Sequence, residues 1–225
     1  MTDFLLIRHG ETDWNRELRF QGTIDIPLND MGLLQAQRLK QRFTNTLALW
    51  RADQRGIHSV VSSVLQRAQQ TAQPIAELVG MPSILEPGLQ EQCYGIFEGL
   101  TAQEIKLQYP DEWAQWLAFD AQVAVKGAES AQVFHDRVMD TMRALATKYV
   151  DGHVVVVTHG GVLDMIWRHA QQHTLDGRRV CEIPNAGINH VAYDQGRWQV
   201  VQWADTAHLA DLPPQPVYHQ TQLKA

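Results

Sequence analysis

Short apolar runs alternate with stretches of helical periodicity along most of this chain. A continuous apolar run, typical of a strand buried on both faces, covers residues 4–7. Residues 57–61 predict a second buried strand, and the β-branched run HVVVV, which begins at His153, predicts a third. Amphipathic repeats between these runs predict helices. The predicted helices cover residues 32–43, 66–80, 101–117 with a break at Pro110-Asp111, and 130–149, and a further one follows Gly160-Gly161.

Local signals mark several ends of these elements. Pro74 predicts a kink in the helix 66–80 and Gly80 predicts its C-terminal stop, while Ser130 is the expected N-cap of the long helix that follows it. Two apolar stretches, 189–193 and 198–203, flank a polar turn and predict a hairpin or a pair of neighbouring strands.

This alternation predicts an α/β fold. We expect a single three-layer domain, with a mostly parallel central sheet and helices on both faces. No repeat, low-complexity segment or Gly/Ser-rich linker marks a domain boundary. The expected domain covers residues 1–212, with a helical lid at about 101–125, and a C-terminal tail rich in Pro and Gln covers 213–225.

Composition narrows the classes of partner. The net charge is −6 and the isoelectric point is about 5.9, which argues against a nucleic-acid or anionic-membrane surface. The two cysteines, Cys93 and Cys181, are too few for a disulfide framework and are not spaced as a zinc site. No apolar run reaches the length of a signal segment or a membrane span, so we expect a cytoplasmic protein. Because the protein is acidic as a whole, an anion would have to bind at a local cluster of positively charged side chains.

Two strands of the predicted sheet end at a histidine followed by glycine. These are Arg8-His9-Gly10 and His159-Gly160-Gly161. Ligands of parallel sheets bind beyond the carboxyl ends of the strands, and glycines there leave backbone N–H groups free to approach an anion. A lone histidine at such a place is more often an ordinary loop residue, but two in the same setting, one of them after an arginine, favour a binding site.

Two further segments carry candidate chemistry. SSVLQRAQQTA, residues 62–72, places Arg67 in the first turn of a helix, where it opposes the macrodipole; an anion would compensate, and a solvated surface arginine is the alternative. LQEQCYGIFEGLT, residues 89–101, places Glu91 and Glu98 in an apolar setting, where a carboxyl group can act as a general acid. Either carboxylate could instead cap a helix or pair with an arginine, and we favour that structural role for Glu98.

Taken together, RHGETDWN, both of these segments, GAES at 127–130 and VVVTHGG resemble the histidine phosphatase superfamily, which contains cofactor-dependent phosphoglycerate mutases and many phosphomonoesterases. The match keeps the family's order from residue 4 to about residue 205. The resemblance implies a phosphoglycerate mutase-like fold, with His9 as the nucleophile that forms a phosphohistidine and Glu91 as the acid/base carboxylate. It implies the catalytic residues His9, Glu91, His159, Arg8 and Arg67, with Arg8, Arg67 and His159 as phosphate-pocket cations, and the substrate-binding residues Arg8, Asn15, Gln21, Gly22, Arg67, His159 and Gly160.

Elementary chemistry agrees with these implied roles. Phosphoryl transfer spreads negative charge over three oxygens, so catalysis is mainly positioning and electrostatic stabilisation, for which the planar fork of arginine is suited. His9 must stay unprotonated at its attacking nitrogen, and Arg8 and Arg67 favour that state. Glu91 then protonates the leaving alkoxide and later takes a proton from the hydrolytic water. The expected protein is a histidine acid phosphatase-type monoester hydrolase that acts on a small phosphorylated metabolite and needs no metal or other cofactor.

The region after Glu91 bears on whether the phosphoryl group goes to water or returns to substrate. Residues 100–126 contain two lysines and no arginine, whereas a mutase needs extra cations there, and FEGLT at 97–101 matches the phosphatase branch. Hydrolysis is therefore favoured, with the mutase as runner-up. A non-catalytic phosphate-ligand sensor would lack His9 or Glu91, and both are present. The lid residues Trp113, Trp116 and Phe119 suit an apolar or sugar-like substrate body, although core packing explains any single tryptophan equally simply.

The sequence gives less support to a metal-dependent hydrolase or to a protein-interaction module. His169 and His173 stand four apart on the predicted last helix, as in a metal site, but Ala170 replaces the glutamate of the zinc-protease motif, so a solvated helix face is favoured. No periodic or contiguous apolar stretch marks a partner surface. The resemblance allows a homodimer. The substrate, and the roles of Glu11 and Glu98 beyond anchoring loops, stay open.

Overall fold

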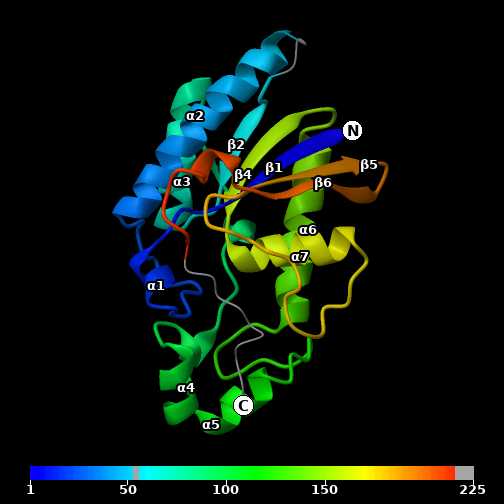
Figure 1. Cartoon of the computed structure of the whole chain (residues 1–225). Helices are drawn as coiled ribbons and strands as arrows, with labels where there is room; N and C mark the ends of the chain where they lie inside the picture. The colour runs from blue at the N-terminus through cyan, green and yellow to red at the C-terminus, as the bar shows by residue number, and fades with distance from the viewer. Residues whose placement is uncertain (53–55, 216–225) are drawn as a thin grey trace.

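Among the described residues, six strands form the central sheet, in the order β3-β2-β4-β1-β5-β6 (Figure 1). The computed structural model describes residues 1–52 and 56–215. β1, β2, β3 and β4 are parallel, whereas β5 runs antiparallel to both β1 and β6. The mostly parallel sheet of the predicted α/β fold is thereby confirmed. The strands are β1 (Thr2–Arg8), β2 (Ser59–Ser62), β3 (Ile84–Leu85), β4 (His153–Thr158), β5 (Ile188–Asp194) and β6 (Arg197–Asp205).

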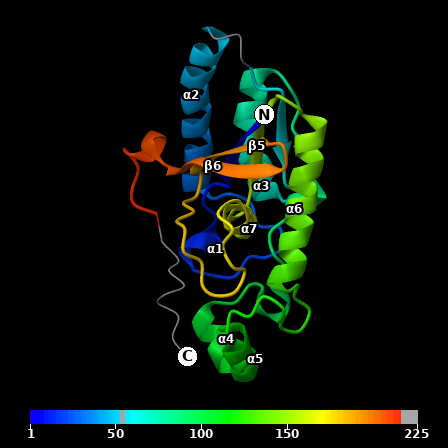
Figure 2. The ribbon, with the colours of Figure 1, turned by 90° about the vertical axis from the view of Figure 1, so that its right-hand side faces the viewer.

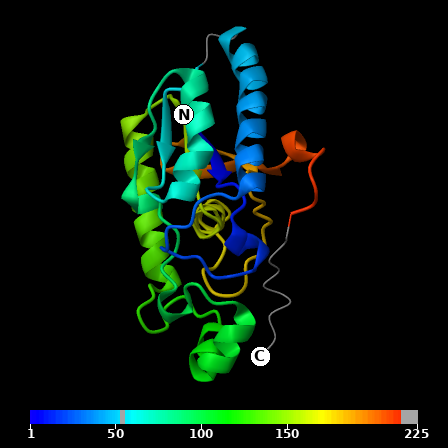
Figure 3. The ribbon, with the colours of Figure 1, turned by 90° about the vertical axis from the view of Figure 1, so that its left-hand side faces the viewer.

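Helices cover both faces of this sheet. α2 and α3 pack on one face and α6 and α7 on the other, as the two side views show with α2 and α6 on opposite sides of the strands (Figures 2 and 3). Short 3₁₀ turns at Pro87–Leu89, Gly95–Phe97 and Ala207–Leu209 join the elements. The helices are α1 (Asp13–Arg16), α2 (Asp30–Ala52), α3 (Gln66–Val79), α4 (Ala102–Gln108), α5 (Pro110–Trp116), α6 (Ala131–Lys148) and α7 (Gly160–Ala170).

The continuous apolar run in β1 feeds two separate cores. Phe4 and Leu6 lie in the cluster under α6 and α7, whereas Leu5 and Ile7 lie in the cluster under α2 and α3. Successive side chains of a strand point to opposite faces, so a strand covered on both sides must be apolar at every position. β4, with four valines in a row, follows the same rule.

Several predicted element ends are confirmed. Ser130 accepts a hydrogen bond from the backbone N–H of Val133 (3.3 Å) at the start of α6, and Gly80 ends α3 with a φ of 74°. The break at Pro110 separates α4 from α5, and β5 and β6 form the predicted hairpin.

Other element predictions need correction. α2 is longer than the predicted 32–43, and the two-residue strand β3 carried no sequence signal. The prediction that His169 and His173 share a helix is wrong, because α7 ends at Ala170 and the backbone N–H of His173 bonds to Arg168 O in the closing turn (2.8 Å).

The predicted lid forms a distinct end of the molecule. α4 and α5 lie together below the sheet in Figure 1, around an apolar cluster that includes Phe97, Ile105 and Trp113. Trp113 is 3% exposed and stacks on Trp116 with ring centroids 5.3 Å apart, so it is a core residue. Arg19, from the segment after α1, bonds to Glu104 of α4 (2.7 Å) and ties this end to the rest of the domain.

The described part of the predicted tail contacts the domain. Gln215 accepts a hydrogen bond from the backbone N–H of Asn185 (2.7 Å) and donates one to its carbonyl (2.8 Å). Residues 216–225 lie outside the described residues. Within residues 1–52 and 56–215, no helix has both the length and the apolar character needed to cross a membrane.

Candidate active site

Adjacent parallel strands bring the two glycine-linked histidines together. β1 pairs with β4 so that Arg8 lies opposite Thr158, and the backbone N–H of His9 bonds to Thr158 O (2.8 Å). The chain leaves both strands at the same edge, and the rings of His9 and His159 lie with centroids 5.2 Å apart. Both side chains are almost fully buried. The juxtaposition of these two strand ends follows directly from the sheet topology.

The ring of His9 is oriented by its own turn. Its Nδ1 lies 2.7 Å from Gly10 O, and a carbonyl oxygen can only accept, so Nδ1 carries the proton and Nε2 carries the lone pair. Asn185 donates to His9 O (3.0 Å) and fixes the backbone of the turn. Burial, followed by the charges of Arg67 and Arg8, lowers the pKa of His9 well below 6.5. His9 is therefore a neutral imidazole at pH 7, with the lone pair on Nε2.

Arg67 reaches the site from the first turn of α3. Its side chain is fully buried, and it donates from Nη1 to Ile24 O (2.8 Å) and from Nη2 to Gly22 O (2.7 Å). Gly22 has a φ of +53°, and a Cβ there would lie 2.0 Å from Glu98 Oε1. A side chain at residue 22 would therefore disturb the loop that holds the Arg67 guanidinium.

Three buried nitrogen atoms at this site have no hydrogen-bond partner among the residues that the structure describes. They are Arg8 Nε, Arg67 Nε and His159 Nδ1. Buried donors are almost always satisfied in native proteins, so this group fits an anionic ligand. Burial lowers the pKa of both Arg8 and Arg67 to about 10, so both stay cationic at neutral pH. The two arginines supply the local positive charge that an acidic protein needs in order to bind phosphate.

The resemblance implies that His159 is a phosphate-pocket cation, and the surroundings of its ring bear on its charge. Burial, then the neighbouring Arg67, His9 and Arg8, lowers its pKa well below 6.5, so the ring is neutral here. Its Nε2 lies 2.7 Å from Ser63 Oγ, and Ser63 directly follows β2 beside β4. An anion beside Nδ1 favours the tautomer in which the Ser63 hydroxyl donates to Nε2 and the neutral ring carries its proton on Nδ1. His159 then offers an anion one N–H donor rather than a full charge.

Glu91 contacts the start of α7. Its Oε2 accepts from the backbone N–H of Gly161 (3.0 Å) and its Oε1 from that of Gln92 (2.9 Å). A Cβ at residue 161 would lie 2.2 Å from Glu91 Oε1. Glycine at position 161 thus leaves room for a carboxylate beside the turn that carries His159.

The other predicted site residues surround this centre in different ways. Asn15 Oδ1 accepts from Thr12 N (3.0 Å) and from Asn185 Nδ2 (3.3 Å), so its carbonyl builds the loop after β1. Gln21 is buried, and its Oε1 has no hydrogen-bond partner within the described chain. A Cβ added at Gly160 would lie 3.5 Å from Arg8 Nε, so this glycine lies beside the guanidinium.

The two glutamates with open roles both anchor loops. Glu11 Oε1 accepts from Arg16 Nε (2.5 Å) and from Asn29 Nδ2 (2.9 Å). Glu98 Oε1 accepts from the backbone N–H groups of Thr23 (2.9 Å) and Tyr94 (3.0 Å). Glu98 thus has a structural role, but it bridges two loops through backbone N–H groups instead of capping a helix or pairing with an arginine as predicted.

Sequence reasoning missed two residues of the site. Ser63 lies inside a segment that the sequence had singled out, but only the pairing of β2 with β4 shows which histidine it meets. Asn185 comes from the irregular segment between α7 and β5, where no periodic pattern places a side chain. In residues 1–52 and 56–215, no three His, Cys, Asp or Glu side chains are grouped as a metal site would require.

Comparison with known proteins agrees with this arrangement. The sequence profile of the histidine phosphatase superfamily, branch 1, matches residues 4–206. This chain belongs to that superfamily. A metal-independent phosphoserine phosphatase of Arabidopsis thaliana is 33% identical over 94% of this chain and 85% of its own length. A probable phosphoglycerate mutase GpmB of Yersinia pestis is 29% identical over 95% of this chain and 97% of its own length.

Several solved structures share the fold. YhfR of Bacillus stearothermophilus superposes with a TM-score of 0.83 at 25% identity, covering 93% of this chain and 100% of its own. A mutant phosphoserine phosphatase of Entamoeba histolytica, in complex with phosphoserine, gives 0.80 at 25% identity over the same shares of the two chains. A mycobacterial glucosyl-3-phosphoglycerate phosphatase bound to vanadate gives 0.76 at 26% identity, covering 91% of this chain and 99% of that one. The fold is thus phosphoglycerate mutase-like, and both phosphatases and mutases occur among the relatives.

Proposed function

We propose that this protein is a phosphomonoesterase that hydrolyses a small phosphorylated metabolite through a phosphohistidine on His9, without a metal ion. The observation that carries the proposal is a neutral, buried His9 beside three buried nitrogen atoms of Arg8, Arg67 and His159 that have no hydrogen-bond partner within the described chain. A nucleophile that is not protonated, next to donors for the three phosphoryl oxygens, is what phosphoryl transfer to nitrogen requires.

The first step breaks the ester bond. Nε2 of His9 attacks phosphorus and forms a P–N bond while the P–O bond to the alcohol breaks. The negative charge on the transferring oxygens is stabilised by Arg8, Arg67 and the Nδ1–H of His159. The alkoxide leaves with a proton from the carboxyl group of Glu91.

The second step regenerates the enzyme. Glu91, now a carboxylate, takes a proton from a water molecule whose oxygen attacks phosphorus. The P–N bond breaks, inorganic phosphate is released and the electron pair returns to Nε2 of His9. Glu91 lies within reach of the turn that carries His159, through its bond to Gly161 N (3.0 Å), so the same carboxyl group can serve both steps.

The lid supports hydrolysis over mutase activity. A mutase must hold a second anionic group while it returns the phosphoryl group, and residues 100–126 provide two lysines and no arginine for that purpose. The phosphoserine phosphatase relative, at 33% identity, gives further support. The mutase stays the second candidate, because GpmB is also a relative. A phosphate sensor is disfavoured by the presence of both His9 and Glu91.

Hydrolysis of p-nitrophenyl phosphate in excess chelator tests the proposal. Wild-type protein should release phosphate and the His9→Ala variant should not, because no other described side chain takes the place of Nε2. Interconversion of phosphoglycerates after priming with bisphosphoglycerate, without release of phosphate, would instead establish a mutase. Phosphate binding with neither activity would establish a sensor.

A further inference from the structure

The segment that follows α7 brings another arginine to the edge of the phosphoryl site. Arg179 Nη1 lies 3.5 Å from the position that a Cβ on Gly160 would occupy, and Arg8 Nε lies at the same distance from that position. The two guanidinium groups therefore border the same glycine, the first residue of α7. The two guanidinium groups are also close enough to interact electrostatically: the pKa of Arg8 is lowered first by burial and next by the charge of Arg179.

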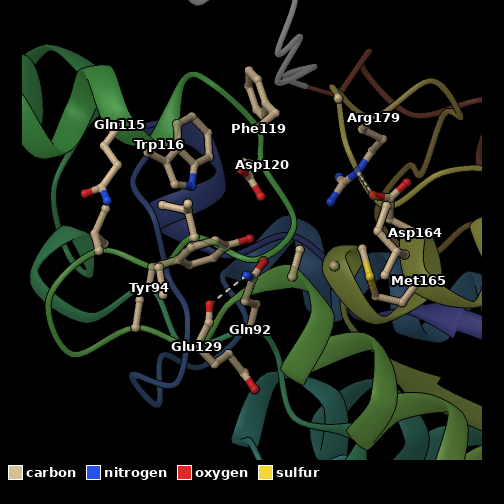
Figure 4. A pocket seen from close by; sticks show the side chains of 18 of the residues that line it. Gln92, Tyr94, Gln115, Trp116, Phe119, Asp120, Glu129, Asp164, Met165 and Arg179 are labelled. Atoms are coloured by element: carbon tan, nitrogen blue, oxygen red, sulfur yellow. Dashed lines mark hydrogen bonds and ion pairs between the residues drawn. The ribbon is translucent and has the colours of Figure 1, made fainter.

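Arg179 belongs to the wall of a pocket that adjoins the acid/base carboxylate. Gly161, whose N–H donates to Glu91, lies in the same wall. Figure 4 shows Arg179 with Asp164 on one side of this pocket, and Tyr94 and Trp116 on the other. The leaving oxygen of a phosphoester must approach Glu91 to receive a proton. The alcohol part of the substrate therefore extends into the pocket that Arg179 lines.

Arg179 and a second arginine face the same carboxylate. Its Nε lies 3.8 Å from Asp164 Oδ2, whereas Arg168 Nε lies closer to the same oxygen, at 3.0 Å. One carboxylate is thus shared by two guanidinium groups. Burial lowers the pKa of Arg179, but Asp164, Tyr94 and Glu91 together outweigh burial and raise it, so the group stays charged.

The remaining polar groups of this pocket do not offer a second strong anion site. The acidic side chains Asp120 and Glu129 also line it, and Asp120 Oδ1 accepts from Gln122 N (2.8 Å). Arg168 is 2% exposed and donates to four backbone carbonyls in addition to Asp164, so its donors are committed to the fold. Neither lysine of the lid lines the pocket.

We propose that Arg179 is a specificity-determining residue that binds a carboxylate on the alcohol part of the substrate. The preferred substrate is then the phosphomonoester of a small hydroxy acid. A planar guanidinium fork matches the two oxygens of a carboxylate, whereas a second phosphoryl group would need more donors than this wall provides. This inference rests on the proposed hydrolysis at His9, and it replaces the apolar or sugar-like body expected from the lid sequence alone.

Two matched substrate pairs isolate the carboxylate. Phosphoserine and phosphoethanolamine differ by the carboxylate alone, and 3-phosphoglycerate and glycerol 3-phosphate differ by its replacement with a hydroxymethyl group. In the Arg179→Gln variant, kcat/KM for the two acids should fall about 10- to 100-fold, which is the loss of one charge-assisted contact, mainly through KM. Activity on the two partners and on p-nitrophenyl phosphate should change by less than about threefold, within the usual effect of an independent contact.

Two further variants control for charge and folding. Arg179→Lys should recover part of the selectivity for the acids, since it keeps the charge but loses the fork. Arg178→Gln removes the neighbouring arginine, whose guanidinium lies 5.5 Å from the centroid of the Phe119 ring, and should leave the ratio between acid and partner unchanged. Thermal unfolding of each variant shows whether the domain is intact.

Two results would overturn the subsite. One is an unchanged ratio between acid and partner in Arg179→Gln, and the other is an equal loss on every substrate, including p-nitrophenyl phosphate, together with weaker vanadate inhibition. The latter would assign Arg179 to the phosphoryl pocket. If wild type hydrolyses none of these compounds, the proposed function fails. Calorimetry then measures the affinities of the His9→Ala variant for 3-phosphoglycerate and glycerol 3-phosphate, with and without Arg179→Gln. A ratio of the two affinities that falls in Arg179→Gln supports the subsite, and an unchanged ratio overturns it.

Discussion

Replacing Gly161 by alanine should disable the general acid while it leaves the phosphoryl site intact. The added Cβ would lie 2.2 Å from Glu91 Oε1 and 3.0 Å from Phe134 Cε1. Ordinary contact requires a separation of about 3.3 Å, so the carboxylate must retreat by about 1 Å. The hydrogen bond from Gly161 N (3.0 Å) that positions Glu91 is then lost or bent.

The size of the effect follows from this displacement. A shift of about 1 Å in a catalytic group can cost about 100-fold, and general acid catalysis as a whole contributes roughly 10²- to 10⁴-fold. We expect kcat/KM on an alkyl phosphate to fall about 100-fold. On p-nitrophenyl phosphate the loss should stay below about tenfold, because its phenolate leaves without a proton. Stability should change little, since alanine favours the helix over glycine by up to about 1 kcal/mol, which offsets the contact.

The assay is the ratio of kcat/KM on the two substrates in wild type, Gly161→Ala, Glu91→Gln and the double variant. Because Gly161→Ala acts through Glu91, the double variant should lose little more than Glu91→Gln alone. Gly160→Ala is the matched control. Its methyl group would meet Arg8 Nε and Arg179 Nη1 at 3.5 Å and no carboxylate, so any loss should be similar on both substrates. Equal losses on both substrates in Gly161→Ala, or additive losses in the double variant, would refute the reasoning.

Three further outcomes are expected from the electrostatics of the site. Arg67→Ala should weaken vanadate inhibition by about 10- to 100-fold and move the acidic limb of the pH–rate profile upward, because the charge of Arg67 lowers the pKa of His9; an unmoved limb would contradict this. Ser63→Ala should lower activity on alkyl and nitrophenyl phosphates equally, since Ser63 fixes the tautomer of His159, and a loss confined to alkyl phosphates would count against that role. Because the pKa values of His9 and His159 are lowered in the folded state, both histidines take up protons on unfolding at acidic pH. Their contribution to stability is complete above pH 6.5 and falls by about 1.4 kcal/mol per pH unit for each histidine as the pH drops towards the folded-state values. Urea unfolding of a His9→Asn/His159→Asn variant at pH 7 and pH 5.5 should show a smaller pH dependence than wild type, and equal dependence would exclude this origin.

The sheet could be predicted because its strands must be apolar on both faces. Residues 4–7 and 154–157 are uninterrupted apolar runs, and a His-Gly pair begins two residues after the end of each. The pattern placed His9 and His159 at the same edge of the sheet, but it did not give the strand order; the pairing of β1 with β4 brings their ring centroids to 5.2 Å. The long helices were also visible, since an amphipathic helix leaves a periodic pattern.

The parts that escaped prediction depend on contacts between distant segments. Arg179 and Asn185 lie in the segment between α7 and β5, whose path is set by the loops it packs against and not by a local pattern. The end of α7 before His173 was missed for a similar reason. Arg168 binds the backbone carbonyls of the following turn, and these bonds stop the helix earlier than its polar sequence suggests.

The lid sequence does not show which of its aromatic residues face the pocket. Trp113 is packed inside the lid's own cluster, whereas Trp116 and Phe119 line the pocket. Arg179, which also lines the pocket, lies more than fifty residues later in the sequence. Which residues share a cavity is decided by tertiary packing, which a linear pattern does not encode.

The central claim is that a phosphoryl group passes through Nε2 of His9. The most direct measurement is rapid quenching of the wild-type protein during turnover of p-nitrophenyl phosphate in excess chelator, followed by mass spectrometry of the peptide that contains His9. The account predicts an acid-labile phosphoryl group on His9 that forms before phosphate is released and is absent from the His9→Asn variant. Turnover with no adduct on His9, or an adduct on another residue, would contradict it.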